Sequence, residues 1–472
     1  MQQSLLPKSF LLSYIYNDTY KPANLTGSIA DLPRVFCASI APMEDTLWDV
    51  AVVGGGPAGM MAAGRAAEKG AKVILLEKNE SLGKKLLITG GGRCNVTNAE
   101  EDTRKLLEQF KDAGKFLFSA FSQWGVPNTL RFFHTRDMPT KVEKGLRVFP
   151  VTNRSQSVWD VLVGYIRKNN VVILSQSPVT GIATESAANE NAGTNGKKVI
   201  GVILKNKKVI RANSVIIATG GTSRPETGST GDAYAWLRKI GHTVIEPEPS
   251  LVPLKVKDAW AKRLAGVSLT DIKLTLFQND VKQDTKKGKI LFTHIGISGP
   301  TILNMSKDVG ELLKYGDVTV SLDILPTLDY GQLNLRLQEL FKEHDKKKLK
   351  NALGGLVPSA IIDIVVELSS INPDASCNSV SRDERLRLVK VLKDIPIHID
   401  SLLGVEKAII TSGGVILDEV DFKTMRSRLF PNLYLVGDIL NIDRPSGGYS
   451  LQLCWTTGFV AGEHAGPTLK HL

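Results

Sequence analysis

The chain has 472 residues, of which 42% are hydrophobic and 23% charged, a composition ordinary for a globular protein with two or three domains. No apolar run approaches the length of about 18 residues that a membrane-spanning helix needs, so we expect no transmembrane helix. The four cysteines stand far apart and form no Cys-x-x-Cys pair, which argues against a structural zinc site and a disulfide scaffold. We therefore expect a protein of a reducing compartment without a bound metal.

The first 43 residues differ from the rest of the chain. They are rich in Ser, Thr, Leu and Tyr, contain only Asp18 and Asp31 as acids, and show no helical or strand periodicity. Residues 35–39 resemble a plastid processing site, whereas the Arg-rich amphipathic helix of a mitochondrial presequence is missing. We expect residues 1–43 to be a transit peptide for the chloroplast stroma. The alternatives are a mitochondrial leader and the disordered tail of a cytoplasmic protein.

Basic residues gather in three clusters, and the net charge is +11 with an isoelectric point near 9.3. Such runs are commonly solvated faces. Three of them in one chain also indicate a nucleic-acid partner, because phosphate groups are attracted to a strong positive field. The clusters are Lys205, Lys207, Lys208 and Arg211; Lys282, Lys286, Lys287 and Lys289; and Lys342, Lys346, Lys347, Lys348 and Lys350.

Residues 49–77 carry the pattern of a dinucleotide-binding βαβ unit. A buried apolar run leads into Gly54-x-Gly56-x-x-Gly59, an Ala-rich helical stretch follows, and a second apolar strand ends at Glu77. Gly54 allows the tight turn, Gly56 lets the backbone approach a pyrophosphate, and Gly59 lets the helix lie close to the strand. The helix N-terminus then faces the phosphates, and Glu77 reaches the ribose hydroxyls.

The remaining periodicity predicts that one domain interrupts another. In the first part of the chain we expect a helix at 155–169, strands at 171–174 and 214–218, and a polar hairpin loop at 185–198. In the middle we expect antiparallel strands at 251–254, 268–277 and 289–292 and a mostly helical stretch at 330–391. A buried strand at 433–438 then returns to the first domain. We divide the chain into a cofactor domain (44–247 and 405–472) and an insertion (248–404), β-rich over 248–325 and helical over 326–394. The expected fold class is α/β, with a two-dinucleotide-type Rossmann domain that carries the inserted domain.

The C-terminal part favours FAD as the cofactor. The strand that ends in Gly437-Asp438 places a carboxylate where a ribityl chain would lie. A helix predicted over 451–464 would point its N-terminus at the flavin, where a helix dipole stabilises negative charge by about 0.3–1 kcal/mol. No second Gly-x-Gly-x-x-Gly follows a strand, so NAD(P)H is expected only as a transient electron donor. Gly447-Gly448 is expected to approach the cofactor closely.

The most unusual stretch is the loop Gly83 to Asn98, which contains three consecutive glycines, Gly90-Gly91-Gly92. Glycines cost backbone entropy on folding, so their presence indicates that the backbone approaches something closely. Because the loop follows the ribose-binding strand, the cofactor is the expected object.

The sequence resembles the YhiN-like flavoproteins, also called the BaiN/RdsA or aminoacetone-oxidase-like family, from Trp48 to the end. The resemblance lies in Ile88 to Asn95 with Thr97-Asn98, in Leu291 to Pro300, and in Gly447-Gly448-Tyr449 with Gln452. It implies a FAD domain with a β-barrel-like and helical insertion. It also implies several activities: reduction of conjugated enones in bile-acid derivatives, amine oxidation, and dihydrouridine formation in bacterial large-subunit rRNA.

Two departures from the family pattern concern the expected site. The family often has Gly-Glu where this chain has Gly437-Asp438, and Asn where this chain has Ser450. Aspartate keeps an acceptor for the ribityl hydroxyls, whereas the serine alters expected substrate contacts. The residues that we expect to hold the cofactor are Gly54, Gly56, Pro57, Ala58, Gly59, Glu77, Lys78, Lys85, Gly91, Gly92, Arg93, Asn95, Thr97, Thr219, Gly220, Gly437, Asp438, Gly448, Tyr449 and Ser450.

Reduction of a uracil ring needs a hydride at the carbon β to the carbonyl and a proton at the α carbon. Cys94 is the first candidate for the proton donor, because a thiol with a pKa of about 8.5 is mostly protonated near neutral pH. Tyr449 is the second, and His294 in the insertion could cap the flavin. Each has a structural alternative, since a buried cysteine is commonly a small hydrophobe. We expect either an organellar rRNA dihydrouridine synthase, or a small-molecule enone reductase or amine oxidase, or a flavin-carrying assembly protein.

Overall fold

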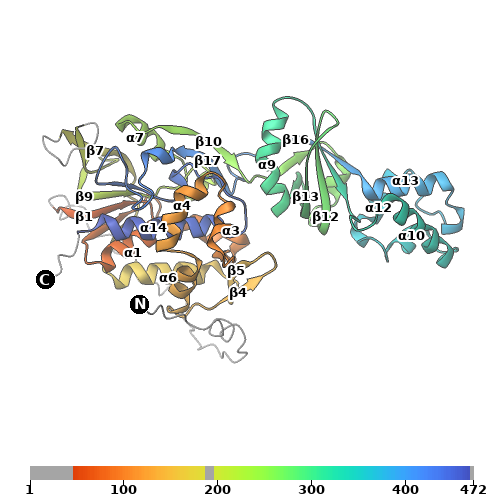
Figure 1. Ribbon diagram of the computed structural model, residues 1–472, viewed down its shortest axis with the longest axis horizontal. Helices are drawn as coiled ribbons and strands as arrows, with labels where there is room; N and C mark the ends of the chain where they lie inside the picture. Colours follow the sequence, from red (N-terminus) through yellow and green to blue (C-terminus); the bar gives the residue numbers. More distant parts are fainter. Residues whose placement is uncertain (1–45, 187–195, 468–472) are drawn as a thin grey trace, which may run out of the picture.

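The computed structural model describes residues 46–186 and 196–467. The expected transit peptide and the middle of the expected loop at 185–198 lie outside these residues. Figure 1 shows three parts in a row: a Rossmann-type α/β domain, a β-barrel and a group of helices at the far end. Over the described ranges, no helix is both long and apolar enough to cross a membrane.

A seven-stranded sheet forms the centre of the α/β domain. Its strand order is β6-β2-β1-β9-β8-β7, and β18 also pairs with β9. The strands are β1 (Trp48–Val53), β2 (Val73–Leu76), β6 (Val172–Leu174), β7 (Val179–Ser186), β8 (Lys197–Leu204), β9 (Val209–Ile217) and β18 (Leu433–Leu435). β6, β2, β1, β9 and β18 run parallel. The continuous apolar sequences of β2 and β18 follow from burial on both faces of the sheet.

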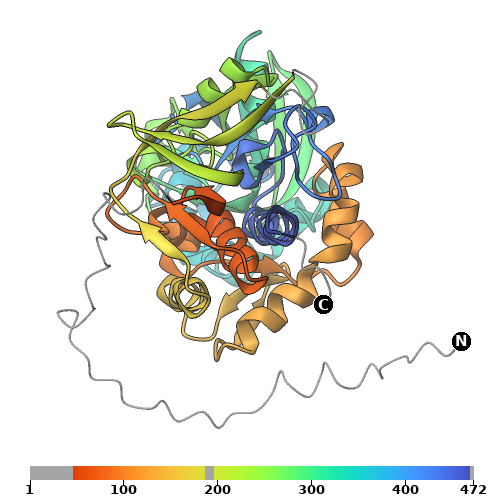
Figure 2. The same cartoon turned by 90° about the vertical axis from the view of Figure 1, so that its left-hand side faces the viewer.

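Helices pack against this sheet. α1 (Pro57–Glu68) begins earlier than its Ala-rich stretch, because Pro57 occupies the first helical position, where its missing N–H costs nothing. α14 (Tyr449–Ala465) packs along α1, and the view in Figure 2 looks nearly along both helices. The other helices are α6 (Ser155–Lys168) and α7 (Asp232–Ile240).

A smaller group of elements lies between β2 and α6. It contains α2 (Lys84–Ile88), a 3-10 turn (Thr89–Gly92), α3 (Thr103–Glu108), α4 (Ala113–Gln123), α5 (Val126–His134) and the strands β3 (Thr97–Asn98), β4 (Thr140–Glu143) and β5 (Arg147–Pro150). The three strands form one antiparallel sheet in the order β3-β5-β4. The β4–β5 hairpin extends from the α/β domain toward the barrel (Figure 1).

The insertion contains a closed antiparallel barrel of six strands in the order β11-β14-β13-β12-β15-β16. They are β11 (Leu254–Val256), β12 (Ser268–Gln278), β13 (Val281–Phe292), β14 (Gly296–Ser298), β15 (Val318–Asp323) and β16 (Ile395–Leu402). The interior is aliphatic, with Leu274, Val320 and Ile397 fully buried. Closure leaves no unpaired strand edge. Beyond the barrel lie α10 (Tyr330–Glu343), α11 (Leu349–Leu353), α12 (Ser359–Leu368) and α13 (Arg382–Lys393).

The stretch expected to be β-rich, 248–325, contains β11 to β15, and α8 (Ala259–Arg263) and α9 (Pro300–Leu313) lie between its strands. One expectation for the insertion was wrong. The strand expected at 251–254 begins only at Leu254, since Leu251 adopts a left-handed φ of 54°.

The two chain crossings between the domains run side by side. β10 (Val244–Ser250) pairs in antiparallel orientation with β17 (Ile410–Val415). The boundary drawn after residue 247 therefore falls inside β10, which leads out of the α/β domain, while β17 leads back into it. This two-stranded connection holds the barrel against the α/β domain through backbone hydrogen bonds.

We predict that Gly59→Ala destabilises the α/β domain by about 2–3 kcal/mol. A methyl group on Gly59 would lie 1.9 Å from the carbonyl oxygen of Gly54, so backbone would have to move. Gly164→Ala in α6 is the control, because nothing lies within 4 Å of its added methyl group. It should stabilise by about 0.5–1 kcal/mol, through helix propensity. Chemical unfolding followed by tryptophan fluorescence measures both; equal stabilities would contradict the account.

Candidate functional site

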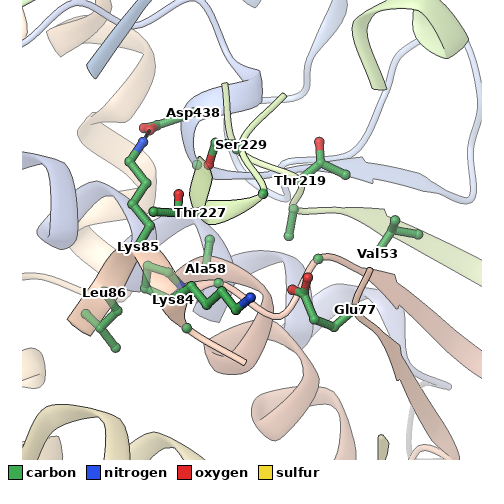
Figure 3. Close-up of a pocket in the computed structure, with 18 of the residues that line it drawn as sticks. Val53, Ala58, Glu77, Lys84, Lys85, Leu86, Thr219, Thr227, Ser229 and Asp438 are labelled. Carbon is green, nitrogen blue, oxygen red and sulfur yellow. Dashed lines mark ion pairs between the residues drawn. The ribbon is translucent and has the colours of Figure 1, made fainter. Parts of the chain in front are cut away.

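A cavity with about 1190 Å³ of empty space, partly open to solvent, lies at the carboxyl ends of the parallel strands. The segments after β1, β2, β9 and β18 line it, together with the first turns of α1, α2 and α14. This is the edge at which open α/β sheets bind ligands. Within the described residues, the 248–404 insertion contributes no lining side chain. Figure 3 shows part of the lining.

The N-terminus of α1 forms one wall of the cavity. Gly56 is its N-cap, and among the described residues no side chain caps the first turn. A methyl group on Gly56 would meet nothing within 4 Å, so the backbone is open to a ligand there. Helix N-termini with free amide groups bind phosphate. Gly59 faces β1 instead and allows the close approach of helix and strand.

Glu77 marks the end of β2. The residue is 7% exposed, and its carboxylate accepts hydrogen bonds from the amides of Gly55 and Asn79, each at 2.8 Å. These two contacts fix the carboxylate at the cavity wall and leave further acceptor capacity for ligand hydroxyls. Lys78 lies beside it, and its ammonium group forms an ion pair with Asp232 at 2.7 Å.

Asp438 lies on the opposite side of the pocket from Glu77, and the side chain of Lys85 reaches toward it (Figure 3). The Lys85 Nζ atom lies 3.5 Å from the Asp438 carboxylate. Arg444, whose side chain is fully buried, forms a hydrogen-bonded ion pair with the same carboxylate. Burial alone would raise the pKa of Asp438, but the charges of Arg444 and Lys85 outweigh it and lower the pKa.

Arg444 connects three parts of the site. Besides Asp438, it donates from Nε to the Ser450 hydroxyl at 3.0 Å and from a terminal nitrogen to the Ile442 carbonyl at 2.8 Å. Ser450 and Asp438 both line the cavity. The guanidinium group therefore holds the start of α14 and the turn after β18 in one arrangement. Sequence reasoning missed Arg444, because a lone arginine outside every motif gives no signal.

The insertion reaches the same region through α9. Lys307 forms an ion pair with Asp443 and donates to the Ser412 hydroxyl at 3.0 Å. The Asn304 side-chain oxygen accepts hydrogen bonds from the backbone and hydroxyl of Ser446, at 2.9 and 3.0 Å. These contacts hold the segment that precedes α14, so the barrel and the cavity rim are physically coupled.

These residues fit a flavin dinucleotide. The Thr219 hydroxyl lies at the cavity and is buried without a hydrogen-bond partner in the described structure, as expected of a group that meets a ligand. The α1 N-terminus suits a pyrophosphate and Glu77 suits a ribose. Asp438, at the other side, suits the ribityl hydroxyls. Among the described residues, no group of His, Cys, Asp and Glu side chains could hold a metal ion.

The cavity brings together twelve of the residues expected at the cofactor: Gly54, Gly56, Pro57, Ala58, Glu77, Lys78, Lys85, Thr219, Gly220, Gly437, Asp438 and Ser450. Several lining residues were not expected, among them Lys84, Thr89, Thr227, Ser229, Ile409 and Cys454. They come from helices, 3-10 turns and loops whose approach to the cavity depends on the folded chain, so local sequence patterns carry no signal for them.

The glycine-rich loop meets the cavity only at its start. Thr89 is a lining residue, whereas Gly91, Gly92, Arg93, Asn95 and Thr97 are not. The three glycines have left-handed φ angles of 56°, 67° and 84°, so their turn conformation explains them.

The side chains that follow the glycines have protein partners. Arg93 pairs with Glu143 and Asn153, Asn95 accepts from the Val148 amide at 3.1 Å, and Thr97 bonds Gln452 at 2.7 Å.

Cys94 was expected beside the flavin, and the structure places it elsewhere. Its side chain is fully buried and does not line the cavity, because the left-handed backbone at Cys94 directs the thiol into the core. Burial raises the pKa of the Cys94 thiol to about 12. Gly448 also differs from expectation: a methyl group on it would lie 2.3 Å from the Thr97 backbone, so its close approach is to β3.

Tyr449 and His294 lie outside the cavity lining as well. Tyr449 is the first residue of α14, immediately before the lining residue Ser450, and its half-buried ring meets the edge of Phe110 at 6.0 Å between centroids. His294 is exposed in the turn between β13 and β14 of the barrel. Of the three catalytic candidates, Tyr449 is therefore the one that directly precedes a cavity-lining residue in the sequence.

Comparison with known proteins shows the family. The family described as "HI0933-like protein Rossmann domain" matches residues 48–464 of this chain. The chain belongs to the HI0933-like family. This agrees with the resemblance found in the sequence. The protein is an FAD-dependent oxidoreductase with an FAD-binding Rossmann-type fold.

Two relatives align over nearly their whole length. A protein of Clostridium scindens named 3-dehydro-bile acid delta(4,6)-reductase is 31% identical over 88% of this chain and 98% of its own. A ribosomal RNA dihydrouridine synthase of Escherichia coli is 28% identical over 88% and 97%. Among solved structures, the 3-ketosteroid delta1-dehydrogenase of Sterolibacterium denitrificans has a TM-score of 0.50 at 14% identity, over 89% and 99% of the two chains. That likeness concerns the fold.

We predict that Arg444→Met weakens FAD binding at least tenfold and lowers the thermal midpoint of the apoprotein. The change leaves the Asp438 carboxylate buried with only Lys85 nearby, and loss of one partner of a buried pair costs about 3–5 kcal/mol. Because the pKa of Asp438 is lowered, the stabilisation of the folded protein by its ionised carboxylate is present at neutral pH and is lost in acid. The Arg444→Met variant should lack this stabilisation already at neutral pH. Arg444→Lys should be intermediate. Unchanged FAD affinity in titrations of apoprotein would exclude this role.

Proposed function

We propose that the protein uses FAD to reduce a carbon–carbon double bond conjugated to a carbonyl, with NAD(P)H as electron donor and uridine of organellar large-subunit rRNA as substrate. Near full-length similarity to two named reductases of this bond type carries the proposal. A 3-oxo-4,6-diene and a uracil ring each contain a double bond conjugated to a carbonyl. A shared fold and cavity can therefore act on both.

The choice of RNA as substrate is supported by two observations. A second ribosomal RNA dihydrouridine synthase, from Haemophilus influenzae, is 26% identical over 87% of this chain. The net charge of +11 would attract a polyanion and would be of no use toward a small neutral molecule. Plastid location stays a proposal that follows from the composition of residues 1–43.

The second candidate is a small-molecule enone reductase. It is favoured by one observation, the higher identity of 31% to the bile-acid reductase. In that case the positive surface would have no role in the reaction, and turnover would depend on an apolar pocket.

The chemistry divides between cofactor and protein. FAD, when bound and reduced by NAD(P)H, which would leave as NAD(P)⁺, would supply the hydride for the β carbon. The α1 N-terminus would hold the pyrophosphate, and Asp438 would hold the ribityl chain. The first turn of α14 stabilises negative charge near Ser450 through its dipole. The remaining requirement is a proton for the α carbon, and we assign it to Tyr449.

We predict that Tyr449→Phe slows substrate-dependent flavin oxidation by about 10²–10⁴-fold, the usual contribution of a general acid. Burial, and then the charge of Glu100, raise the pKa of Tyr449 above its ordinary value, so the phenol stays protonated and the wild-type rate should be flat from pH 6 to 9. Cys94→Ala is the control and should change the rate less than about threefold. Anaerobic stopped-flow absorbance measures both; the opposite ranking would restore Cys94 as the donor.

We further predict that the reduced full-length protein is reoxidised by an unmodified organellar large-subunit rRNA transcript under anaerobic conditions. The flavin absorbance should recover while dihydrouridine appears in the RNA in equal amount, because each hydride transferred reduces one uridine. NADH and NADPH are compared as reductants. A flavin that stays reduced with rRNA but reacts with a steroid dienone would favour the small-molecule reductase.

A further inference from the structure

The positive charge of the chain is unevenly distributed. Residues 46–247 contain 28 Lys and Arg against 17 Asp and Glu, whereas the 248–404 insertion contains 22 against 20. The basic clusters of the insertion are balanced by acids nearby, as in the pairs Lys286–Asp284 at 2.8 Å and Lys348–Asp374 at 2.7 Å. The excess positive charge therefore belongs to the α/β domain, where the flavin cavity lies.

One concentration of this charge is the β4–β5 hairpin together with Arg93, which we call the basic hairpin. Its cations are Arg93, Lys141, Lys144 and Arg147, and its one acid is Glu143. The Arg93 and Arg147 guanidinium groups lie 4.1 and 5.7 Å from the ring centre of Phe149. Stacking on one buried ring fixes both groups at the surface. Glu143 is shared between Arg93 and Lys141, whose Nζ lies 3.6 Å from its carboxylate, so one acid only partly balances these cations and a phosphate can bind beside it.

The basic hairpin is joined to the cavity by the glycine turn. Thr89 lines the cavity, and a methyl group on Gly90 would lie 3.4 Å from the Phe149 ring. Nothing within 4 Å would meet a methyl group on Gly91 or Gly92. The backbone of Gly90, Gly91 and Gly92, which we call the glycine shelf, therefore lies between the cavity and the hairpin and is open to close approach by a polynucleotide.

The hairpin also presents apolar side chains to solvent. Val142 and Leu146 are 51% and 44% exposed, and Ile88 and Val151 beside the glycine turn are 41% and 50% exposed. Apolar contacts next to cations suit unpaired bases next to their phosphates.

The tip of the hairpin contacts the barrel. Lys144, 84% exposed, pairs with Asp271 of β12 at 3.2 Å. An exposed pair of this kind contributes little to stability. A phosphate group could therefore replace Asp271 as the partner of Lys144 at small cost.

We propose that the basic hairpin is the docking surface for the phosphate backbone of an RNA strand whose target base enters the flavin cavity across the glycine shelf. The inference rests on the proposed function and names the part of the protein that makes RNA its substrate. Phosphate contacts fix the register of the strand, while the cavity reads the base. The hairpin thereby distinguishes an RNA reductase from a small-molecule reductase of the same fold.

The test compares two triple variants of the full-length holoprotein. Lys141→Ala/Lys144→Ala/Arg147→Ala removes three cations of the basic hairpin, and Lys282→Ala/Lys286→Ala/Lys287→Ala removes three from β13 of the barrel. Binding to an organellar large-subunit rRNA fragment is measured by fluorescence anisotropy at several salt concentrations. The hairpin variant should bind at least tenfold more weakly. Its slope of log K against log salt should be smaller by about 2, since each lost phosphate contact contributes about 0.7. The barrel variant should stay within about twofold.

Two further variants separate a lost contact from a damaged fold. Lys141→Glu/Lys144→Glu keeps Arg147, whose Nε donates to the Lys144 carbonyl at 3.0 Å, and should weaken binding more than the alanines do. Asp271→Asn releases Lys144 and should strengthen binding about twofold, a change that no loss of structure would cause. FAD content and oxidation of the reduced flavin by a steroid dienone should be equal in all variants.

The outcomes distinguish the inference from the proposed function. Equal RNA binding by the hairpin and barrel variants would overturn the inference, even if the wild type makes dihydrouridine. Hairpin-dependent RNA binding without dihydrouridine would support the docking surface and overturn the proposed substrate. A wild type that binds no RNA would overturn both.

Discussion

The α1 helix can lie against β1 only because residue 59 lacks a side chain, and the rest of the site depends on that contact. The carbonyl of Gly54 occupies the place where a methyl group of residue 59 would be. The close approach directs the first amides of α1 at the cavity and lets α14 pack along the other side of α1. The cavity therefore follows from the packing of small residues.

A second constraint is electrostatic. Asp438 lies in the turn that follows β18, and it stays ionised inside the protein because Arg444 and Lys85 lie beside it. Arg444 also binds Ser450, and α9 of the insertion holds the residues on either side of Arg444. A displacement of the barrel would thus reach the flavin end of the cavity through Asp443 and Ser446.

The parts of the structure that were predictable from sequence are those with local physical causes. The turn at Gly54, the acid at Glu77 and the strand leading to Asp438 each follow from spacing and burial along one segment. Arg444 was not predictable, because its role depends on contacts made only in the folded chain. Cys94 was misplaced for a similar reason: the loop reaches the cavity at Thr89, but the left-handed turn then directs the thiol into the core. The α9 helix was missed because Gly-Pro indicates a turn as readily as a helix start.

The charge of the protein is better understood in space than along the chain. The lysine runs of the insertion attract attention in the sequence, yet nearby acids balance them. The cations of the basic hairpin come from two segments, Arg93 and the β4–β5 hairpin, and Phe149 brings Arg93 and Arg147 together. Substrate choice within one fold can therefore depend on a surface outside the catalytic cavity.

We propose that this FAD-dependent oxidoreductase acts on uridine of organellar rRNA. The most direct measurement is mass spectrometry of dihydrouridine in large-subunit rRNA from cells with and without the gene for this chain. The account predicts the loss of dihydrouridine at one position, with recovery on expression of the wild-type chain and not of the Tyr449→Phe variant. An unchanged dihydrouridine content would contradict it.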